Sequence, residues 1–181
     1  MEQVGITRLI DRVGLALSDV TDAVYLSTND RLADSYSCGG GDCIHVADNY
    51  PGTGGLAGVE AVLGLGSDVI AVAWDMPFVN SELLIAIRDA ANAGDADIVA
   101  PESLSPHGIE PFCAFYSVRV REPLARFLEE GGGPAHQFIS RIPRTYRLPL
   151  AEVRKAGDPN QLFFSVNTPA DLERARAMLL R

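Results

Sequence analysis

The chain has 181 residues, with 24 acidic and 15 basic residues that give a formal net charge of −9. A domain of this size buries roughly 70% of the surface of its unfolded chain, so it needs no disulfide or metal to stay folded. The negative charge excludes nucleic acid as a partner, and no apolar run approaches the roughly 20 residues that span a bilayer. Three cysteines give no disulfide framework, so we expect a protein of the cytoplasm that does not bind membranes.

Short β-rich runs alternate with helical patterns along the whole chain. The patterns predict strands over 23–27, 43–47, 68–73, 98–100 and 112–116, and helices over 6–16, 56–63, 81–93, 118–129, 135–142 and 169–180. Thr7 is expected to cap the first helix. After Asp68, the strand over 68–73 is apolar, so we expect neither of its faces to be exposed to water. The alternation predicts one α/β domain over 1–181, with a mostly parallel sheet, helices on both faces and ligands at the carboxyl ends of the strands.

Asp75 is the residue whose position in the sequence most strongly indicates a chemical role. It follows the apolar strand directly, and Pro77 turns the chain just after it. A carboxylate at the carboxyl edge of a sheet is well placed to meet a hard cation and a triphosphate. The alternative interpretation is an aspartate that caps the next turn.

A glycine-rich loop over 50–58 opens the second predicted helix. Backbone N–H groups at a helix N-terminus can hold a phosphate or the edge of a base when no side chains stand in the way. The loop matches neither the dinucleotide fingerprint nor the P-loop, so a plain flexible turn is an equal alternative.

The segment over 163–172 contains a predicted helix start. Thr168 is a suitable N-cap, Pro169 fits the first helical position and Asp171 fits the third. A capped C-terminal helix accounts for these residues but not for Asn167. An amide at the end of a strand is well suited to hydrogen-bond a heterocycle or a sugar. The three histidines share no ligand spacing, which argues against zinc chemistry.

Taken in order, these segments resemble the molybdenum cofactor guanylyltransferase family, nucleotidyltransferases of glycosyltransferase-A-like fold. The segments that carry the resemblance are 7–13, 26–29, 54–58, 73–78, 110–116 and 164–169. The resemblance implies a three-layer fold and a reaction that transfers GMP from GTP to the phosphate of molybdenum-bearing molybdopterin, with release of pyrophosphate. It also implies Mg²⁺ on a catalytic aspartate, Asp75.

The resemblance assigns the remaining site residues as well. Asn167 would lie toward molybdopterin, and the guanine nucleotide would be held by Asn29, Asp48, Gly54, Leu56 and Gly58. Contact with molybdoenzymes or with cofactor-handling proteins is a further partnership that it allows.

The chain departs from the family pattern in several places. Family members begin with a strand and a loop, Leu-Ala-Gly-Gly-x-Ser-x-Arg-Met-Gly-x-x-Lys, and Met1 aligns just after that lysine, so we expect the domain to lack its first strand and signature loop. Ser165 replaces an Asn, Gly55 replaces a Pro, and Trp74 replaces a Gly and would crowd the phosphate pocket.

Two interpretations are open from the sequence. The chain is an enzyme whose missing segment belongs upstream of Met1, or it is a catalytically impaired paralogue that acts as a nucleotide- or partner-binding module. Transfer from CTP, or to another phosphorylated acceptor, is also open.

Overall fold

The largest sheet has four strands, of which three run in the same direction. The computed structural model describes residues 3–4, 7–29, 38 and 43–180. The sheet contains β5 (Val69–Val72), β6 (Ile98–Pro101), β7 (Cys113–Tyr116) and β8 (Thr145–Leu148), in the order β5-β7-β6-β8. β7 is antiparallel to both of its neighbours, and β6 and β8 are parallel. The expected mostly parallel sheet is therefore confirmed, with β7 as its one reversed strand.

The described residues form two further sheets, each of two strands. β3 (Tyr25–Ser27) and β4 (Ile44–Val46) form a parallel pair, and β1 (Gln3–Val4) pairs with β2 (Thr7–Arg8) in antiparallel fashion. Helix α2 (Gly55–Leu63) leads from β4 to β5. This β-α-β connection predicts that β3, β4 and β5 point the same way.

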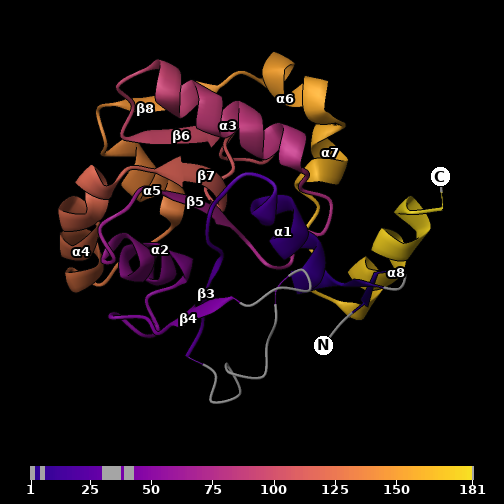
Figure 1. The fold of residues 1–181 in the computed structure, drawn as a ribbon, viewed down its shortest axis with the longest axis horizontal. Helices are drawn as coiled ribbons and strands as arrows, with labels where there is room; N and C mark the ends of the chain where they lie inside the picture. Colours follow the sequence, from indigo (N-terminus) through magenta and orange to yellow (C-terminus); the bar gives the residue numbers. More distant parts are fainter. Residues whose placement is uncertain (1–2, 5–6, 30–37, 39–42, 181) are drawn as a thin grey trace.

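Helices cover both faces of the four-stranded sheet, as Figure 1 shows. α2, α4 and α5 supply the apolar cluster on one face, and α3, α6 and α7 supply the cluster on the other. The remaining bounds are α1 (Leu9–Ser18), α3 (Ser81–Ala93), η2 (Val118–Val120), α4 (Arg121–Glu129), α5 (Ala135–Ser140), α6 (Leu150–Ala156), α7 (Pro159–Leu162) and α8 (Pro169–Met178). The result is the expected three-layer α/β domain.

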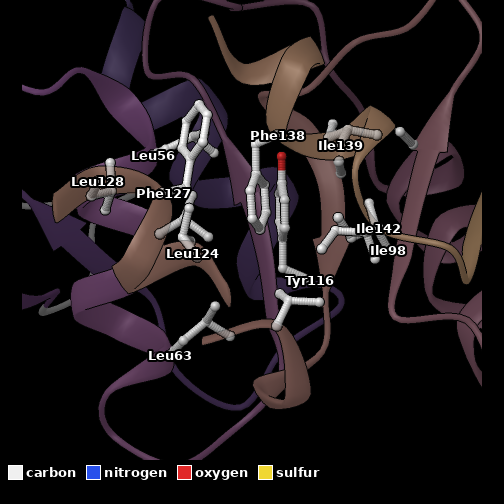
Figure 2. Packing of buried hydrophobic residues seen from close by; sticks show 14 of the residues in the cluster. Leu56, Leu63, Ile98, Tyr116, Leu124, Phe127, Leu128, Phe138, Ile139 and Ile142 are labelled. Carbon is white, nitrogen blue, oxygen red and sulfur yellow. The ribbon is translucent and has the colours of Figure 1, made fainter. Parts of the chain in front are cut away.

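Aromatic rings fill the centre of the first cluster, as Figure 2 shows. The rings of Phe127 and Phe138 lie 5.5 Å apart, and Tyr116 is fully buried. The Tyr116 hydroxyl donates a hydrogen bond of 2.8 Å to the carbonyl of Pro111. A buried hydroxyl is costly unless it is paired, and this bond satisfies it. The bond also holds Pro111, which precedes β7, against the core.

The first helix begins later than expected. Thr7 and Arg8 form β2, and α1 begins at Leu9 with Arg8 as its N-cap residue, so the predicted Thr7 cap is wrong. The Arg8 guanidinium instead closes the first turn through an ion pair with Asp11, at 2.6 Å.

β5 also differs from its prediction, since all four of its residues are only half-buried. Its free edge borders a cavity, described below, and this explains why an apolar strand is not enclosed. None of the helices in the described part of the chain is long and apolar enough to cross a membrane.

Candidate nucleotide-binding site

A cavity of about 1070 Å³ lies between β3 and β5. Asp48 and Asp75, which follow β4 and β5, both line it, and so do Gly54 and Gly58 from the start of α2. Trp74 lines it as well, with its side chain exposed. The cavity therefore collects four of the residues that the sequence proposed for the site.

Asp48 is held by polar contacts from the end of β3. The Asn29 side chain donates from Nδ2 to Asp48 Oδ2 at 2.9 Å, and its Oδ1 accepts from the Asp48 backbone N–H at 3.1 Å. Ser27 Oγ donates to Asp48 Oδ1. A Cβ at position 58 would lie 2.6 Å from Ser27 Oγ, so the close approach of α2 to this cluster requires Gly58. These contacts fix a carboxylate and an amide at one edge of the cavity.

Side-chain hydrogen bonds hold both ends of the glycine-rich loop. The buried Glu60 accepts hydrogen bonds from the Asn49 amide (2.9 Å) and from Arg121 (3.2 Å), and Tyr50 donates to Glu129 (3.1 Å). Gly54, the N-cap of α2, has φ of +93°, a conformation that favours glycine. No side chain caps α2, and Ala57 donates to the Gly54 carbonyl at 3.0 Å, so the N–H groups of Gly55 and Leu56 are the ones left for a ligand at this helix N-terminus.

Glu110 lies beside Asp75, which the sequence did not indicate. Val72 pairs with Cys113, and the Ala73 N–H donates to the Phe112 carbonyl at 2.8 Å, so the pairing brings the turns that contain Asp75 and Glu110 to the same edge of the sheet. Burial raises the pKa of Asp75. Burial, and then the charge of Asp75, raise the pKa of Glu110 to about 7. Only the pairing of 69–72 with 113–116 would have revealed this second carboxylate.

The C-terminal segment contacts the Asp75 loop through its backbone. The Val166 N–H donates to the Asp75 carbonyl at 2.9 Å. The same loop is also held from α1, where the Arg12 side chain donates from Nε to the Pro77 carbonyl at 2.9 Å. The predicted cap is present, because Thr168 and Asp171 form a capping box at the start of α8. Asn167 is exposed, between this cap and Val166.

Three predicted site residues lie outside the cavity wall: Asn29, Leu56 and Asn167. Asn29 reaches the site through its bonds to Asp48. The Leu56 side chain is 2% exposed and packs in the core of Figure 2, so only its backbone is available to a ligand. Neither Leu56 nor Asn167 is among the residues that line the cavity.

The structure explains one departure from the family pattern. A Cβ at position 55 would lie 2.8 Å from the Phe112 ring, which leaves no room for the ring of a proline. Gly55 and the large Phe112 therefore form a matched pair.

The donors at the carboxyl edge suit a hard divalent cation. Asp75 and Glu110 offer carboxylate oxygens in a half-buried setting, and Mg²⁺ is usually held by one or two carboxylates together with substrate phosphates. Among the residues that the structure describes, no group of three or more His, Cys, Asp or Glu side chains could hold a metal. A cation here would depend on phosphate oxygens or water for its other ligands.

A family model of the MobA-like NTP transferase domain matches residues 1–145. The chain belongs to this family. A probable molybdenum cofactor guanylyltransferase of Peptoclostridium acidaminophilum is 28% identical over 92% of this chain and 76% of its own. A molybdenum cofactor guanylyltransferase of Desulfosudis oleivorans is 29% identical, over 94% and 82%. The crystal structure of molybdopterin-guanine dinucleotide biosynthesis protein A from Archaeoglobus fulgidus superposes with a TM-score of 0.80, at 26% identity over 98% of this chain and 88% of that one.

Proposed function

We propose that the chain is a molybdenum cofactor guanylyltransferase of the cytoplasm, which transfers GMP from GTP to the terminal phosphate of molybdopterin. The observation that carries the proposal is the single cavity that brings Asp75 together with Asp48 and the open N-terminus of α2. Relatives with this name in the same family support the choice of substrates.

In the proposed reaction an acceptor phosphate oxygen bonds to the α-phosphorus of GTP, and the bond from that phosphorus to the bridging oxygen breaks. Pyrophosphate leaves with the electron pair. Asn29 and Asp48 would hold the guanosine, with Gly54, the Leu56 backbone and Gly58 shaping the surface that it approaches. Asn167 would lie on the acceptor side. Holding two anions in line is the main task, because no covalent enzyme intermediate is needed.

Asp75, with Glu110 beside it, would hold Mg²⁺. The cation would neutralise charge on the phosphates as the bond breaks. Burial raises the pKa of both side chains, and a bound cation would favour their charged forms.

Calorimetry tests the nucleotide part of the proposal. The base-side residues are present, while the family's phosphate loop and its lysine have no counterpart in the sequence. We therefore expect weak binding of GTP that requires Mg²⁺, and weaker binding of GDP and CTP. Equal binding of GTP and GDP without metal would show that Asp75 holds no metal. Tighter binding of CTP than of GTP would assign CTP as the nucleotide substrate.

A fusion tests the transfer itself. A family-type strand-and-loop segment placed ahead of Met1 should give pyrophosphate release from GTP and molybdopterin. The matched control carries Asp75→Asn in the same fusion. A fusion that folds and binds GTP, but releases no pyrophosphate dependent on Asp75, would favour the catalytically impaired paralogue, and Trp74 and Ser165 would then be the first positions to revert.

A further inference from the structure

Two cysteine thiols that take no part in the candidate site lie in contact with each other. Cys38 is only 5% exposed, and Cys43, which directly precedes β4, is half-buried. A side-chain hydrogen bond joins the two, and both are free thiols. Neither lines the cavity that holds Asp48 and Asp75. A disulfide forms only between cysteines whose side chains already approach each other, as these two do.

A histidine gives one of these thiols a proton acceptor. His45 of β4 lies two residues after Cys43, and side chains two residues apart in an extended segment lie on the same face. Nε2 of His45 lies 3.9 Å from Cys43 Sγ, a hydrogen-bond distance for sulfur. The thiolate attacks a disulfide far better than the thiol does, and a neighbouring base promotes its formation. Cys43 is therefore suited to be the attacking thiol of the pair.

Cys38 is suited to the second step of an exchange. Burial, and then the hydrogen bond with Cys43, raise the pKa of Cys38 to about 12. The ion pair of Arg8 and Asp11, at 2.6 Å, lies near both sulfurs, with Arg8 lowering the pKa of Cys38 and Asp11 raising it. A buried, protonated thiol reacts slowly with a solute, but its contact with Cys43 places Cys38 to attack any disulfide that forms on Cys43 Sγ.

We propose that Cys38 and Cys43 form a reversible thiol–disulfide exchange site for low-molecular-weight disulfides such as oxidised glutathione, with His45 as the proton acceptor for Cys43. The carrying observation is the arrangement of the two thiols in contact with each other and the imidazole beside the more exposed one.

The exchange has two steps. Cys43 Sγ passes its proton to His45 and bonds to one sulfur of the oxidant, whose S–S bond breaks. The first glutathione leaves as a thiolate and takes the proton from His45. Cys38 Sγ then bonds to Cys43 Sγ, and the second glutathione leaves and takes the Cys38 proton. The cysteine pair loses two electrons and two protons, and the oxidant becomes two molecules of reduced glutathione.

The pair lies within the connection from β3 to β4, and the two ends of this connection carry Asn29 and Asp48. Oxidation would place a covalent link in that connection. The exchange itself needs neither GTP nor Mg²⁺, so its test is independent of the proposed transfer of GMP.

Mass spectrometry of the full chain, incubated with oxidised glutathione and a metal chelator, is the test. The wild-type monomer should lose the mass of two hydrogen atoms and should regain it with a reducing agent. A protease that cleaves before aspartate cuts between the two cysteines, at Asp42. The fragments that carry Cys38 and Cys43 should therefore stay joined until they are reduced.

Three variants separate the roles of the residues. Cys38→Ser should stop at the first step and keep one glutathione on Cys43. Cys43→Ser is its matched control and should take up little glutathione. His45→Gln should slow the first step at least about tenfold near neutral pH, and the difference should shrink at higher pH as hydroxide removes the proton instead. A loss of packing alone would not depend on pH in this way.

Alkylation of the wild-type chain with iodoacetamide gives a second readout that needs no variant. Cys43 should be modified well before Cys38. The proposal would be overturned by a wild-type chain in which no bond joins 38 to 43, by disulfides that form only between chains, or by alkylation of Cys38 first. Equal uptake of glutathione by Cys38→Ser and Cys43→Ser would overturn the assignment of Cys43 as the attacking thiol.

Discussion

The pKa values of carboxyl groups are shifted in opposite directions at the two ends of the four-stranded sheet. At the end where β6 and β8 begin, Asp97 accepts from Arg144 at 2.8 Å and from Arg119 at 2.6 Å. Burial alone would raise the pKa of Asp97, but these arginines outweigh it and hold that pKa below its usual value. At the other end, Asp75 and Glu110 have raised pKa values. The first end is a satisfied ion-pair network, whereas carboxylates with raised pKa values, such as those at the second end, are common at functional sites.

Removing the charge at Asp75 should give the largest effect. In the active fusion, Asp75→Asn should lower pyrophosphate release at least about a hundredfold, because a group that stabilises developing charge is worth that much. GTP affinity should change far less, and turnover measured at saturating GTP separates the two. Asp97→Asn is the matched control at the opposite end of the sheet. If Asp97→Asn lowers turnover as much as Asp75→Asn does, the two ends of the sheet do not differ in function.

Glu110→Gln should change the pH dependence of stability. The pKa of Glu110 is raised to about 7 from 4.5, so its contribution to stability is fully present below about pH 4.5 and is lost as the pH rises through 7. The difference in unfolding free energy between wild type and variant should fall by at most about 3 kcal/mol over that range. Urea titrations at several pH values measure it, and added Mg²⁺ should restore wild-type stability above pH 7. A difference that does not vary with pH would contradict the placement of Glu110.

Asp97→Ala should show the opposite linkage. A lowered pKa means that the contribution of Asp97 is present above its usual pKa and is lost as the pH falls through the lowered value. At neutral pH the variant should lose about 2 kcal/mol, the typical worth of hydrogen bonds to charged groups. Thermal or urea unfolding at pH 7 and pH 3 provides the check, and an equal loss at both would show that the network acts through packing alone.

The smallest effect should come from the matched pair at positions 55 and 112. Gly55→Pro should cost about 1 kcal/mol, at the lower end of what overpacking costs, since the end of the Phe112 ring must shift to make space for the proline. Phe112→Leu in the same chain should recover much of that loss, because proline suits the first position of a helix. A double-mutant cycle in urea measures the coupling, and additive losses would rule out the steric explanation.

Local patterns in the sequence predicted most elements but not their pairing. The alternation of apolar runs located β4 and α3, and the Thr168 cap was visible because its chemistry lies within four residues. β8 escaped prediction because its middle residues, Tyr146 and Arg147, are both exposed and show no alternation.

Long-range features were beyond the reach of sequence patterns. Glu110 was missed because only the antiparallel register, across some 35 residues of chain, brings it to Asp75. The half-burial of β5 was missed for the same reason, since it depends on what lies at the strand's other edge.

The C-terminal helix α8 packs in a small apolar cluster of its own. We therefore expect α8 to unfold locally before the rest of the domain. Among the residues that the structure describes, the cluster around α8 has five buried members: Leu9, Phe78, Val166, Leu172 and Ala175. Segments with few buried apolar contacts open at lower free energy than the rest of a domain. Phe78 follows the Asp75 turn, and Val166 bonds to the Asp75 carbonyl, so fraying of α8 would loosen the carboxylate loop first. We therefore expect the segment around Asn167 and the Asp75 turn to open together, while the Asn29 and Asp48 pair, which is bonded at the ends of β3 and β4, stays in place.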